Sequence, residues 1–322
     1  MAKVKQYLYM DKIAVLIPCY NEGLTIYKVV TDAKNALPDA KIYVYDNNST
    51  DNTVEEANRA GAIIRYEHKQ GKGNVVRSMF EQIDAECYIM VDGDDTYDMS
   101  AAPEMARRVL EDHDDMVVGD RLGGAYLTEN KRPFHNLGNL FVRKSINFLF
   151  HTNIADMMTG FRAFSYEFVK TFPSKSDGFQ TETEMSIFSA VYGLRLSSLT
   201  IGYRDRPVGS FSKLNTFKDG FKVLFLIFSL FRSKRSRLYF GIIAFILIAL
   251  GVGFLIPVFI TYFKQGNVPN FPTLIVCCFC ILTGIIALFT GLILSALESN
   301  DRNVYRHEYS RVHDEKKRKL EK

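Results

Sequence analysis

Residues 88–95 read YIMVDGDD, an apolar run that stops at a cluster of carboxylates. The run predicts a buried strand that delivers Asp92 and Asp94 to its carboxyl end. Side chains at such a position can converge on a hard cation such as Mg²⁺ or Mn²⁺, which prefers oxygen ligands. A cation held there suits a diphosphate, because it neutralises the charge that builds up on a leaving group. We therefore expect a metal site formed by Asp92 and Asp94 beside a diphosphate-containing substrate.

Apolar, β-branched runs alternate with helical patterns along the first third of the chain. The runs that predict strands are residues 13–17, 41–45, 62–66, 87–91 and 116–119. The patterns that predict helices are residues 25–36, 53–60, 73–83 and 102–111. This alternation indicates an α/β domain with a mostly parallel, twisted sheet and helices on both faces. Ligands of such a domain gather at the carboxyl ends of its strands.

Polar motifs follow the predicted strands where ligands are expected. PCYNE at residues 18–22 follows the first strand, and DNNSTD at residues 46–51 follows the second. The second motif could also be a plain turn and helix cap, since Ser, Asn and Asp favour both. HKQGKGN at residues 68–74 lacks the spacing of a Walker loop. Its Lys72, beside glycines at a helix start, could approach phosphate oxygens, or the segment could be an ordinary loop.

Length and composition limit the class of protein. The 322 residues allow one sizeable α/β domain and an appendage, and a net charge of +4 is too small to indicate nucleic acid. The five cysteines show no paired or zinc-like spacing, which favours reduced thiols and a cytosolic soluble part. We expect no export signal, because no apolar signal segment precedes Asp11.

Two uncharged apolar stretches, residues 238–263 and 271–297, follow the α/β region. Each exceeds the roughly 20 residues that span about 30 Å of hydrocarbon, so we expect two antiparallel transmembrane helices rather than buried soluble ones. Domain boundaries follow from these stretches. They are a cytosolic domain at 1–215, an interfacial amphipathic basic helix at 216–237, the spans at 238–263 and 271–297, and a basic cytosolic tail at 298–322.

Positive charges predict how the spans are oriented. Arg and Lys cluster at residues 232–237 and in the tail after Ser299, whereas the connector carries only Lys264. The positive-inside rule then places the catalytic domain and both termini in the cytosol, with the protein in the cytoplasmic membrane. Residues 134–150 form a second interfacial candidate or an ordinary core helix. Homo-oligomers are expected to use close-packing glycines of the spans, namely Gly241, Gly251, Gly253, Gly284 and Gly291.

The ordered series of motifs resembles the family 2 glycosyltransferases with a GT-A fold. It is most similar to the polyprenyl-phosphate glycosyltransferases, such as dolichyl-phosphate mannose synthase and bacterial two-span undecaprenyl-phosphate glucosyltransferases. The resemblance extends from Ile13 through the second span. Its carriers are IPCYNE at 17–22, YDNNSTD at 45–51, DGDDTYD at 92–98, GDR at 119–121, DMMTGFR at 156–162, ETE at 182–184, YRDR at 203–206 and SKL at 212–214.

The resemblance implies roles for the residues of these motifs. Part of the set would bind the nucleotide sugar: Pro18, Tyr20, Glu22, Asp46, Lys72, Asp92, Gly93, Asp94, Arg206 and Lys213. Asp46 would contact the base, while Asp92 and Asp94 would hold Mg²⁺ or Mn²⁺ and the diphosphate. Arg121 would meet the lipid phosphate, and the transferred sugar and acceptor would be surrounded by Asp156, Arg162, Glu182 and Glu184. The residues implied in catalysis are Asp92, Asp94, Asp156 and Arg121.

The reaction implied is an inverting transfer of a hexose from a nucleotide sugar onto undecaprenyl or dolichyl phosphate at the cytoplasmic membrane face. Thr96 stands where mannosyl synthases usually carry Gln, which favours UDP-glucose or UDP-N-acetylglucosamine over GDP-mannose. The resemblance also implies a separate flippase for the product. Transfer to a lipid hydroxyl stays open, with Asp156 or Glu184 as base. A processive polysaccharide synthase would need a Gln-x-x-Arg-Trp motif, and this chain has no Trp. A non-catalytic sugar-nucleotide sensor is a further alternative.

Overall fold

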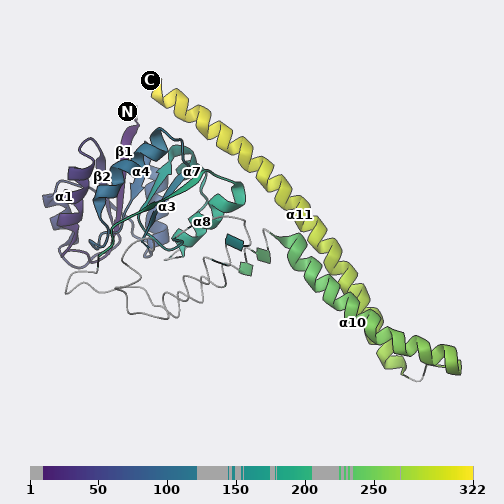
Figure 1. Ribbon diagram of the computed structural model, residues 1–322. Helices are drawn as coiled ribbons and strands as arrows, with labels where there is room; N and C mark the ends of the chain where they lie inside the picture. Colours follow the sequence, from purple (N-terminus) through teal and green to yellow (C-terminus); the bar gives the residue numbers. More distant parts are fainter. Residues whose placement is uncertain are drawn as a thin grey trace, which may run out of the picture. The chain divides into compact units, whose positions relative to one another are not determined.

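Two structural units make up the chain in the computed structural model (Figure 1). One comprises Met1–Leu224 and Tyr305–Lys322, and the other comprises Phe225–Val304. The structure describes residues 10–121, 156–174, 180–204, 235–268 and 270–321, together with positions 144, 147, 148, 154, 178, 225, 228, 229, 231 and 232.

The described part of the first unit contains a seven-stranded sheet of order β3-β2-β1-β4-β6-β5-β7. Its strands are β1 (Asp11–Cys19), β2 (Lys41–Asp46), β3 (Ile63–Tyr66), β4 (Ala85–Met90), β5 (Met116–Asp120), β6 (Arg162–Ser165) and β7 (Leu196–Thr200). Strands β1 to β4 are parallel, and β5 pairs in parallel with β7. Strand β6 runs antiparallel between β4 and β5, so a segment late in the sequence is inserted into the middle of the sheet.

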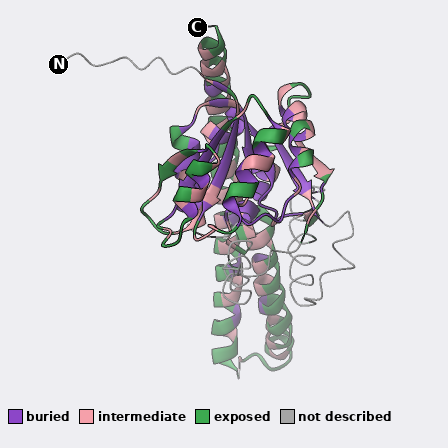
Figure 2. Cartoon of the chain, turned by 90° about the vertical axis from the view of Figure 1, so that its left-hand side faces the viewer, coloured by how far each residue is buried: buried purple, intermediate pink, exposed green. Residues whose placement is uncertain are grey.

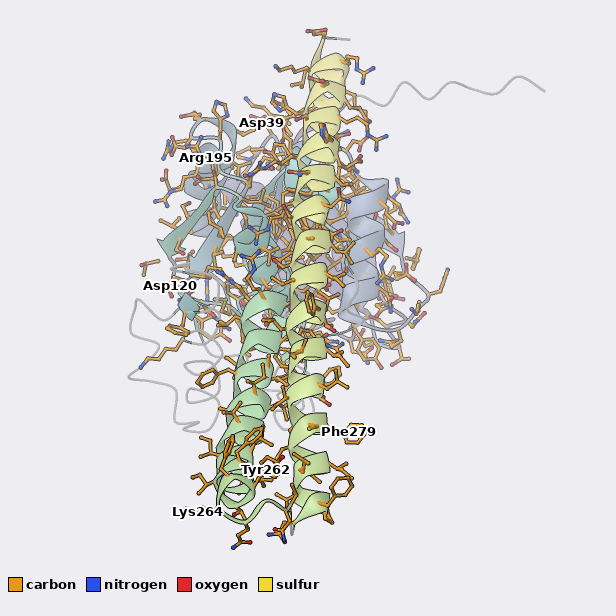
Figure 3. All side chains as sticks on the ribbon, turned by 90° about the vertical axis from the view of Figure 1, so that its right-hand side faces the viewer. Asp39, Asp120, Arg195, Tyr262, Lys264 and Phe279 are labelled. Carbon is orange, nitrogen blue, oxygen red and sulfur yellow. The ribbon has the colours of Figure 1, made fainter. Side chains whose placement is uncertain are left out.

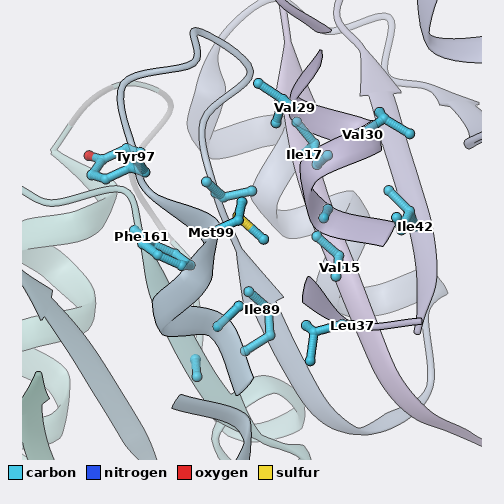
Figure 4. Close-up of a cluster of buried hydrophobic side chains, with 14 of the residues drawn as sticks. Val15, Ile17, Val29, Val30, Leu37, Ile42, Ile89, Tyr97, Met99 and Phe161 are labelled. Carbon is cyan, nitrogen blue, oxygen red and sulfur yellow. The ribbon is translucent and has the colours of Figure 1, made fainter. Parts of the chain in front are cut away.

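Helices cover both faces of this sheet. They are α1 (Ile26–Ala36), α2 (Thr53–Arg59), α3 (Lys72–Gln82), the 3₁₀ turn η1 (Met99–Ala101), α4 (Ala102–Leu110), α7 (Tyr166–Thr171) and α8 (Thr181–Tyr192). Side chains of β1 alternate between two buried clusters, with Val15 and Ile17 in one and Ala14 and Leu16 in the other. Helices α1, α2 and α4 complete the first cluster, and α3, α7 and α8 contribute to the second. Figure 4 shows Val29 and Val30 of α1 in the first cluster with Val15 and Ile17 of β1. The strands between the two edge strands β3 and β7 are mostly buried (Figure 2), as expected for a sheet that is covered on both faces.

The predicted α/β fold is confirmed. Each of the five predicted strands and four predicted helices is present, with ends shifted by a few residues. The antiparallel β6, the edge strand β7 and the helices α7 and α8 were not predicted. Residues 134–150 and 216–237, the two predicted interfacial segments, lie mostly outside the described residues.

The second unit contains a helical hairpin. Helix α10 (Ser236–Gln265) and the first part of α11 (Phe271–Leu320) are long and apolar enough, by length and composition, to cross a membrane. Only 11% and 17% of their most apolar windows are buried. Exposed rings such as Tyr262 and Phe279 project from them (Figure 3). Low burial distinguishes the pair from core helices of a soluble domain.

Helix α11 is longer than the predicted span. It continues beyond residue 297, through the predicted basic tail, to Leu320. Residues 305–320 of α11 belong to the first unit. The positive-inside orientation and the limits of the predicted domains stay predictions.

Glycines let α10 and α11 approach each other closely. A methyl group added to Gly251 of α10 would lie 2.7 Å from Cγ1 of Ile281, and one added to Gly284 of α11 would lie 2.6 Å from Cγ1 of Ile248. An added methyl at Gly253 meets no atom within 4 Å among the described residues. Gly251 and Gly284 therefore serve contacts within the hairpin, whereas oligomerisation through glycines stays a prediction.

We predict that Gly284→Val destabilises the hairpin by about 1–3 kcal/mol, because the larger side chain overpacks against Ile248. The measurement is reversible unfolding in mixed micelles, followed by the separation of probes placed on α10 and α11. Gly253→Val is the matched control and should unfold like the parent. Equal destabilisation by both changes would show that helix propensity, not packing, sets the effect.

Candidate active site

The carboxyl ends of β2, β1 and β4 lie side by side, as parallel pairing requires. Cys19 of β1 is in register with Asp46 of β2, and the Val91 amide donates to the Leu16 carbonyl across β1 and β4. The motifs that follow these strands therefore meet at one edge of the sheet. Ligand sites of open α/β sheets are found at this position.

The motif after β1 is joined to the motif after β2. The Asn21 amide donates to Ser49 Oγ at 2.9 Å, and the Glu22 amide donates to Thr53 Oγ1 at 2.8 Å. Asp46 is buried, and its carboxylate accepts from the Ser49 amide. Asp46 thus forms a turn, as the alternative interpretation of this motif predicted, although the N-cap residue of α2, Asn52, makes no side-chain cap bond within the described part of the chain.

The remaining predicted residues of this motif differ in exposure. Pro18 and Glu22 are half-buried, and Tyr20 is 38% exposed. Asn47, which was not predicted, connects the loop before α3 to the same edge. Its Nδ2 donates to the carbonyls of Glu67 and Lys69, and its Oδ1 accepts from the Gly71 amide.

Lys72, the first residue of α3, bridges two carboxylates. Its Nζ lies 2.6 Å from Oδ1 of Asp92 and 2.5 Å from Oε1 of Glu182. Burial opposes the charge of Lys72, but the two carboxylates outweigh it and hold the pKa of Lys72 well above its usual value. Oε2 of Glu182 is buried and has no hydrogen-bond partner among the described residues. The bridge therefore joins the loop after β4 to the first turn of α8.

Asp94 and Gly93, in the loop after β4, are each held by a hydrogen bond from a threonine. Oδ1 of Asp94, which is buried, accepts from the Thr96 hydroxyl at 2.7 Å. The Gly93 carbonyl accepts from Oγ1 of Thr25 at 2.6 Å. A methyl group on Gly93 would lie 2.9 Å from Sγ of Cys19, so the loop after β4 lies directly on the motif after β1.

The DMMTGFR loop lies against the carboxylate of Asp92. A methyl group on Gly160 would collide with Oδ2 of Asp92. The Gly160 amide donates to the Tyr97 hydroxyl at 2.9 Å. Gly160 and Tyr97 were not predicted as site residues, although both lie in motifs quoted for the resemblance. Only a glycine lets the backbone at position 160 come this close to Asp92. The place of Gly160 in the sequence does not by itself reveal this contact.

Arg121 and Asp156 form a buried bidentate pair. Nε and Nη2 of Arg121 lie 2.6 and 3.1 Å from the two oxygens of Asp156. Burial raises the pKa of Asp156, but Arg121 outweighs it, so the pKa of Asp156 lies below its usual value. The guanidinium also lies over the ring of Tyr203, 5.3 Å from its centroid. The pair holds Asp156 in its ionised form.

Arg162 is fully buried and bonded to protein groups. It donates to the carbonyls of Thr159 and Met157 and to the hydroxyl of Ser186 on α8. Burial lowers its pKa to about 10. These contacts show that Arg162 positions the loop before β6, and its predicted contact with the transferred sugar stays a prediction. Glu184 lies half-buried in the first turn of α8, and Arg206 and Lys213 lie outside the described residues.

A divalent metal fits this edge of the sheet only if substrate phosphates and water supply part of its coordination shell. No group of three His, Cys, Asp or Glu side chains converges to enclose a metal within the described ranges. Mg²⁺ commonly binds through one or two carboxylates and completes its shell with substrate phosphates and water. The carboxylates of Asp92 and Glu182 outnumber the one cation, Lys72, that they share, and buried Asp94 follows two residues after Asp92. This excess of negative charge suits a metal held by Asp92 and Asp94 together with a diphosphate.

We predict that Lys72→Met destabilises the domain by about 3–5 kcal/mol, because Glu182 would stay buried without its cation. Urea unfolding measures the change. The double variant Lys72→Met with Glu182→Gln should recover most of the loss, and the exposed Lys12→Met is the control for lysine removal. A double variant that is no more stable than Lys72→Met would show that the bridge is not the cause.

Comparisons with known proteins agree on one family. Residues 14–172 match the model of glycosyl transferase family 2. The chain is 33% identical over 248 residues to the glycosyltransferase AglJ of Haloferax volcanii, covering 76% of this chain and 80% of that protein. It is 27% identical over 228 residues to the dolichyl-phosphate hexose transferase of the same organism, covering 71% of this chain and 97% of the relative.

The fold agrees with a solved structure. The crystal structure of glucosyl-3-phosphoglycerate synthase from M. tuberculosis superposes with a TM-score of 0.52 at 18% sequence identity, covering 70% of this chain and 80% of the other. At this identity the likeness shows the GT-A-like fold alone. The family match and the relative at 33% identity identify the function class: the chain is a glycosyltransferase of family 2.

Proposed function

We propose that this glycosyltransferase moves a hexose from a nucleotide sugar onto a polyprenyl phosphate, such as undecaprenyl or dolichyl phosphate, with inversion at the anomeric carbon. The observation that carries the proposal is the buried pair of Arg121 and Asp156. Both oxygens of Asp156 are engaged, and its pKa is lowered. A carboxylate held in this way is a poor base for activating a hydroxyl acceptor.

A phosphate acceptor needs no such base, because its oxygen is already anionic at neutral pH. The task of the protein is then to position the acceptor and to balance charge. Arg121 is the cation proposed to meet the acceptor phosphate, with Asp156 holding its guanidinium in place. Transfer to a lipid hydroxyl is the alternative, and it would require Asp156 or Glu184 to accept a proton.

The lipid part of the proposal is supported by two observations. Helices α10 and α11 are long and apolar enough to cross a membrane. A relative that matches over most of its length is named a dolichyl-phosphate hexose transferase. A membrane-resident enzyme would meet a polyprenyl acceptor without extracting its tail. The proposed site of action is the cytoplasmic face of the membrane, with a separate flippase for the product.

The donor is proposed to bind along the edge formed after β1, β2 and β4. Asp46, Tyr20, Pro18 and Glu22 line the side where the nucleotide would lie, and Lys72 and Gly93 lie toward the diphosphate. Mg²⁺ or Mn²⁺, held by Asp92 and Asp94, would neutralise the leaving diphosphate. Lys72 pairs with Asp92, the Gly160 backbone lies against the same carboxylate, and the Thr96 hydroxyl is bonded to Asp94.

UDP-glucose or UDP-N-acetylglucosamine is the favoured donor. Thr96 replaces the Gln of mannosyl synthases, and here its hydroxyl is bonded to Asp94 rather than extended into the site. GDP-mannose is the second candidate.

We predict that membranes containing this enzyme transfer label from one UDP-hexose to undecaprenyl phosphate when Mn²⁺ or Mg²⁺ is present. A panel of radiolabelled UDP- and GDP-sugars identifies the donor, and mild acid should release the sugar, as expected for a glycosyl phosphate. Asp94→Asn should lower turnover at least about 10²-fold, comparable to the loss of one electrostatic donor. Its thermal stability is the control for folding.

Different outcomes separate the alternatives. An acid-stable glycolipid product would favour a hydroxyl acceptor. Label transferred only from GDP-mannose would overturn the donor assignment but leave the acceptor assignment intact. Folded enzyme that gives no transfer from any donor would overturn the polyprenyl-phosphate proposal.

We predict that Arg121→Gln raises the KM for the lipid phosphate roughly tenfold or more, because it removes a charged hydrogen-bond donor, while donor binding is unchanged. Initial rates at varied acceptor concentration measure this. Arg65→Gln, at an exposed position on β3, is the matched control. Since Arg121→Gln leaves Asp156 buried and unpaired, the double variant with Asp156→Asn should restore stability but not the KM. A KM restored together with stability would show that Arg121 acts only through folding.

A further inference from the structure

The end of α11, residues 305–320, is bound to the first unit along one side of the helix. We call this segment the latch. Buried or half-buried side chains recur at a spacing of four and three residues, namely Tyr305, Tyr309, Val312, Lys316 and Lys319, and the neighbouring Glu308, His313 and Glu315 are half-buried as well. Positions between them, such as Arg311 and Lys317, are exposed. This spacing places one continuous stripe on the surface of a helix.

The C-terminal half of the stripe, with Lys316 and Lys319, is basic, and it pairs with acidic residues of the domain. Nζ of Lys316 lies 3.1 Å from Glu167 of α7, and Nδ1 of His313 lies 2.7 Å from the same carboxylate. Nζ of Lys319 lies 2.8 Å from Asp84, next to the start of β4. Burial raises the pKa of Glu167, but Lys316 and His313 outweigh it and hold the pKa below its usual value. Charge complementarity therefore fixes the register of the latch.

The N-terminal half of the stripe, with Tyr305, Tyr309 and Val312, packs against the hydrophobic core of the domain. Val312 is buried in the cluster that contains α3, α7 and α8. The ring of Tyr305 lies 4.1 Å from the ring of Tyr192 and 5.4 Å from that of Phe188, both on α8. The hydroxyl of Tyr309 donates to Asp115 at 2.6 Å, beside β5. The segment is thus part of the packed domain and not an appended tail.

Helix α8 connects the latch to the active site. Its last turns carry Phe188 and Tyr192, which contact Tyr305. Its middle carries Ser186, which is bonded to Arg162, and its first turn carries Glu182, which is bonded to Lys72. A shift at the far end of α8 would therefore move the carboxylate that shares Lys72 with Asp92. Because α8 spans only 12 residues, it can transmit such a shift as a rigid element.

We propose that the latch is a positioning element for the active site: it braces α8 and thereby holds Glu182 against Lys72. Helix α11 then carries an apolar span in one part and completes the catalytic domain with another. The residues proposed to position α8 are Tyr305, through ring contacts, and Lys316, through Glu167 of α7, a helix whose Phe168 ring lies 5.7 Å from that of Phe188 on α8.

The test compares two neighbouring lysines that undergo the same charge change. Lys316→Glu places a negative charge beside Glu167, whereas Lys317→Glu makes the same change at an exposed position. Hydrogen–deuterium exchange of the full-length protein in nanodiscs is followed in α8 and, as an internal reference, in α1 and β1. We expect Lys316→Glu to speed exchange in α8 roughly tenfold or more, while α1, β1 and the Lys317→Glu protein stay unchanged.

Two further variants test the proposal independently, in case the Lys316→Glu protein folds poorly. Tyr305→Ala, with Val304→Ala as its exposed control, removes the ring contact without changing charge. The charge exchange Glu167→Lys with Lys316→Glu should restore the protection of α8. Unchanged exchange in α8 in both Lys316→Glu and Tyr305→Ala would overturn the proposal. A uniform rise across the whole domain, or equal effects of Lys316→Glu and Lys317→Glu, would overturn it as well.

Discussion

The ammonium group of Lys72, whose side chain is only 12% exposed, joins two segments of the active site that are distant in the sequence. Lys72 stands at the start of α3 and contacts Asp92 after β4 and Glu182 at the start of α8. Without it, the buried carboxylate of Glu182 would be left without a cation beside the partly exposed carboxylate of Asp92, which is unfavourable. The loop after β4, the DMMTGFR loop and α8 all take their places around this cation. This cation therefore links the loop after β4 to α8, two parts of the site that are distant in the sequence.

The described cationic side chains at the site are all bonded to protein groups, and this limits the chemistry that the site can perform. Lys72 is engaged by two carboxylates, Arg121 by Asp156, and Arg162 by backbone carbonyls and Ser186. A donor diphosphate entering this edge would meet more carboxylates than cations around Lys72. That is the physical reason to propose that a divalent metal accompanies the donor. It is also the reason that an acceptor with its own negative charge fits better than one that must give up a proton.

Helix α11 presents two different surfaces along one continuous element. Its early part is apolar and exposed, and its last turns carry the stripe that packs on the domain. The predicted basic tail describes the composition of this segment correctly. However, the basic residues on the stripe neutralise Asp84 and Glu167. Basic runs in a sequence are usually exposed to solvent. Their pairing with the domain becomes visible only when the structure places Asp84 and Glu167 opposite them.

The sequence by itself determined the parallel part of the sheet, the four helices that follow its strands, the two apolar helices and the edge where the motifs meet, because periodicity and turn residues are local. Tertiary structure alone decided the rest. Strand β6 has four residues and finds its place between β4 and β5 only through pairing partners distant in the chain. The partners of Lys72, the burial of Arg162, the approach of Gly160 to Asp92 and the packing of residues 305–320 likewise join segments far apart in sequence. Such contacts depend on how the elements pack, and no local pattern encodes them.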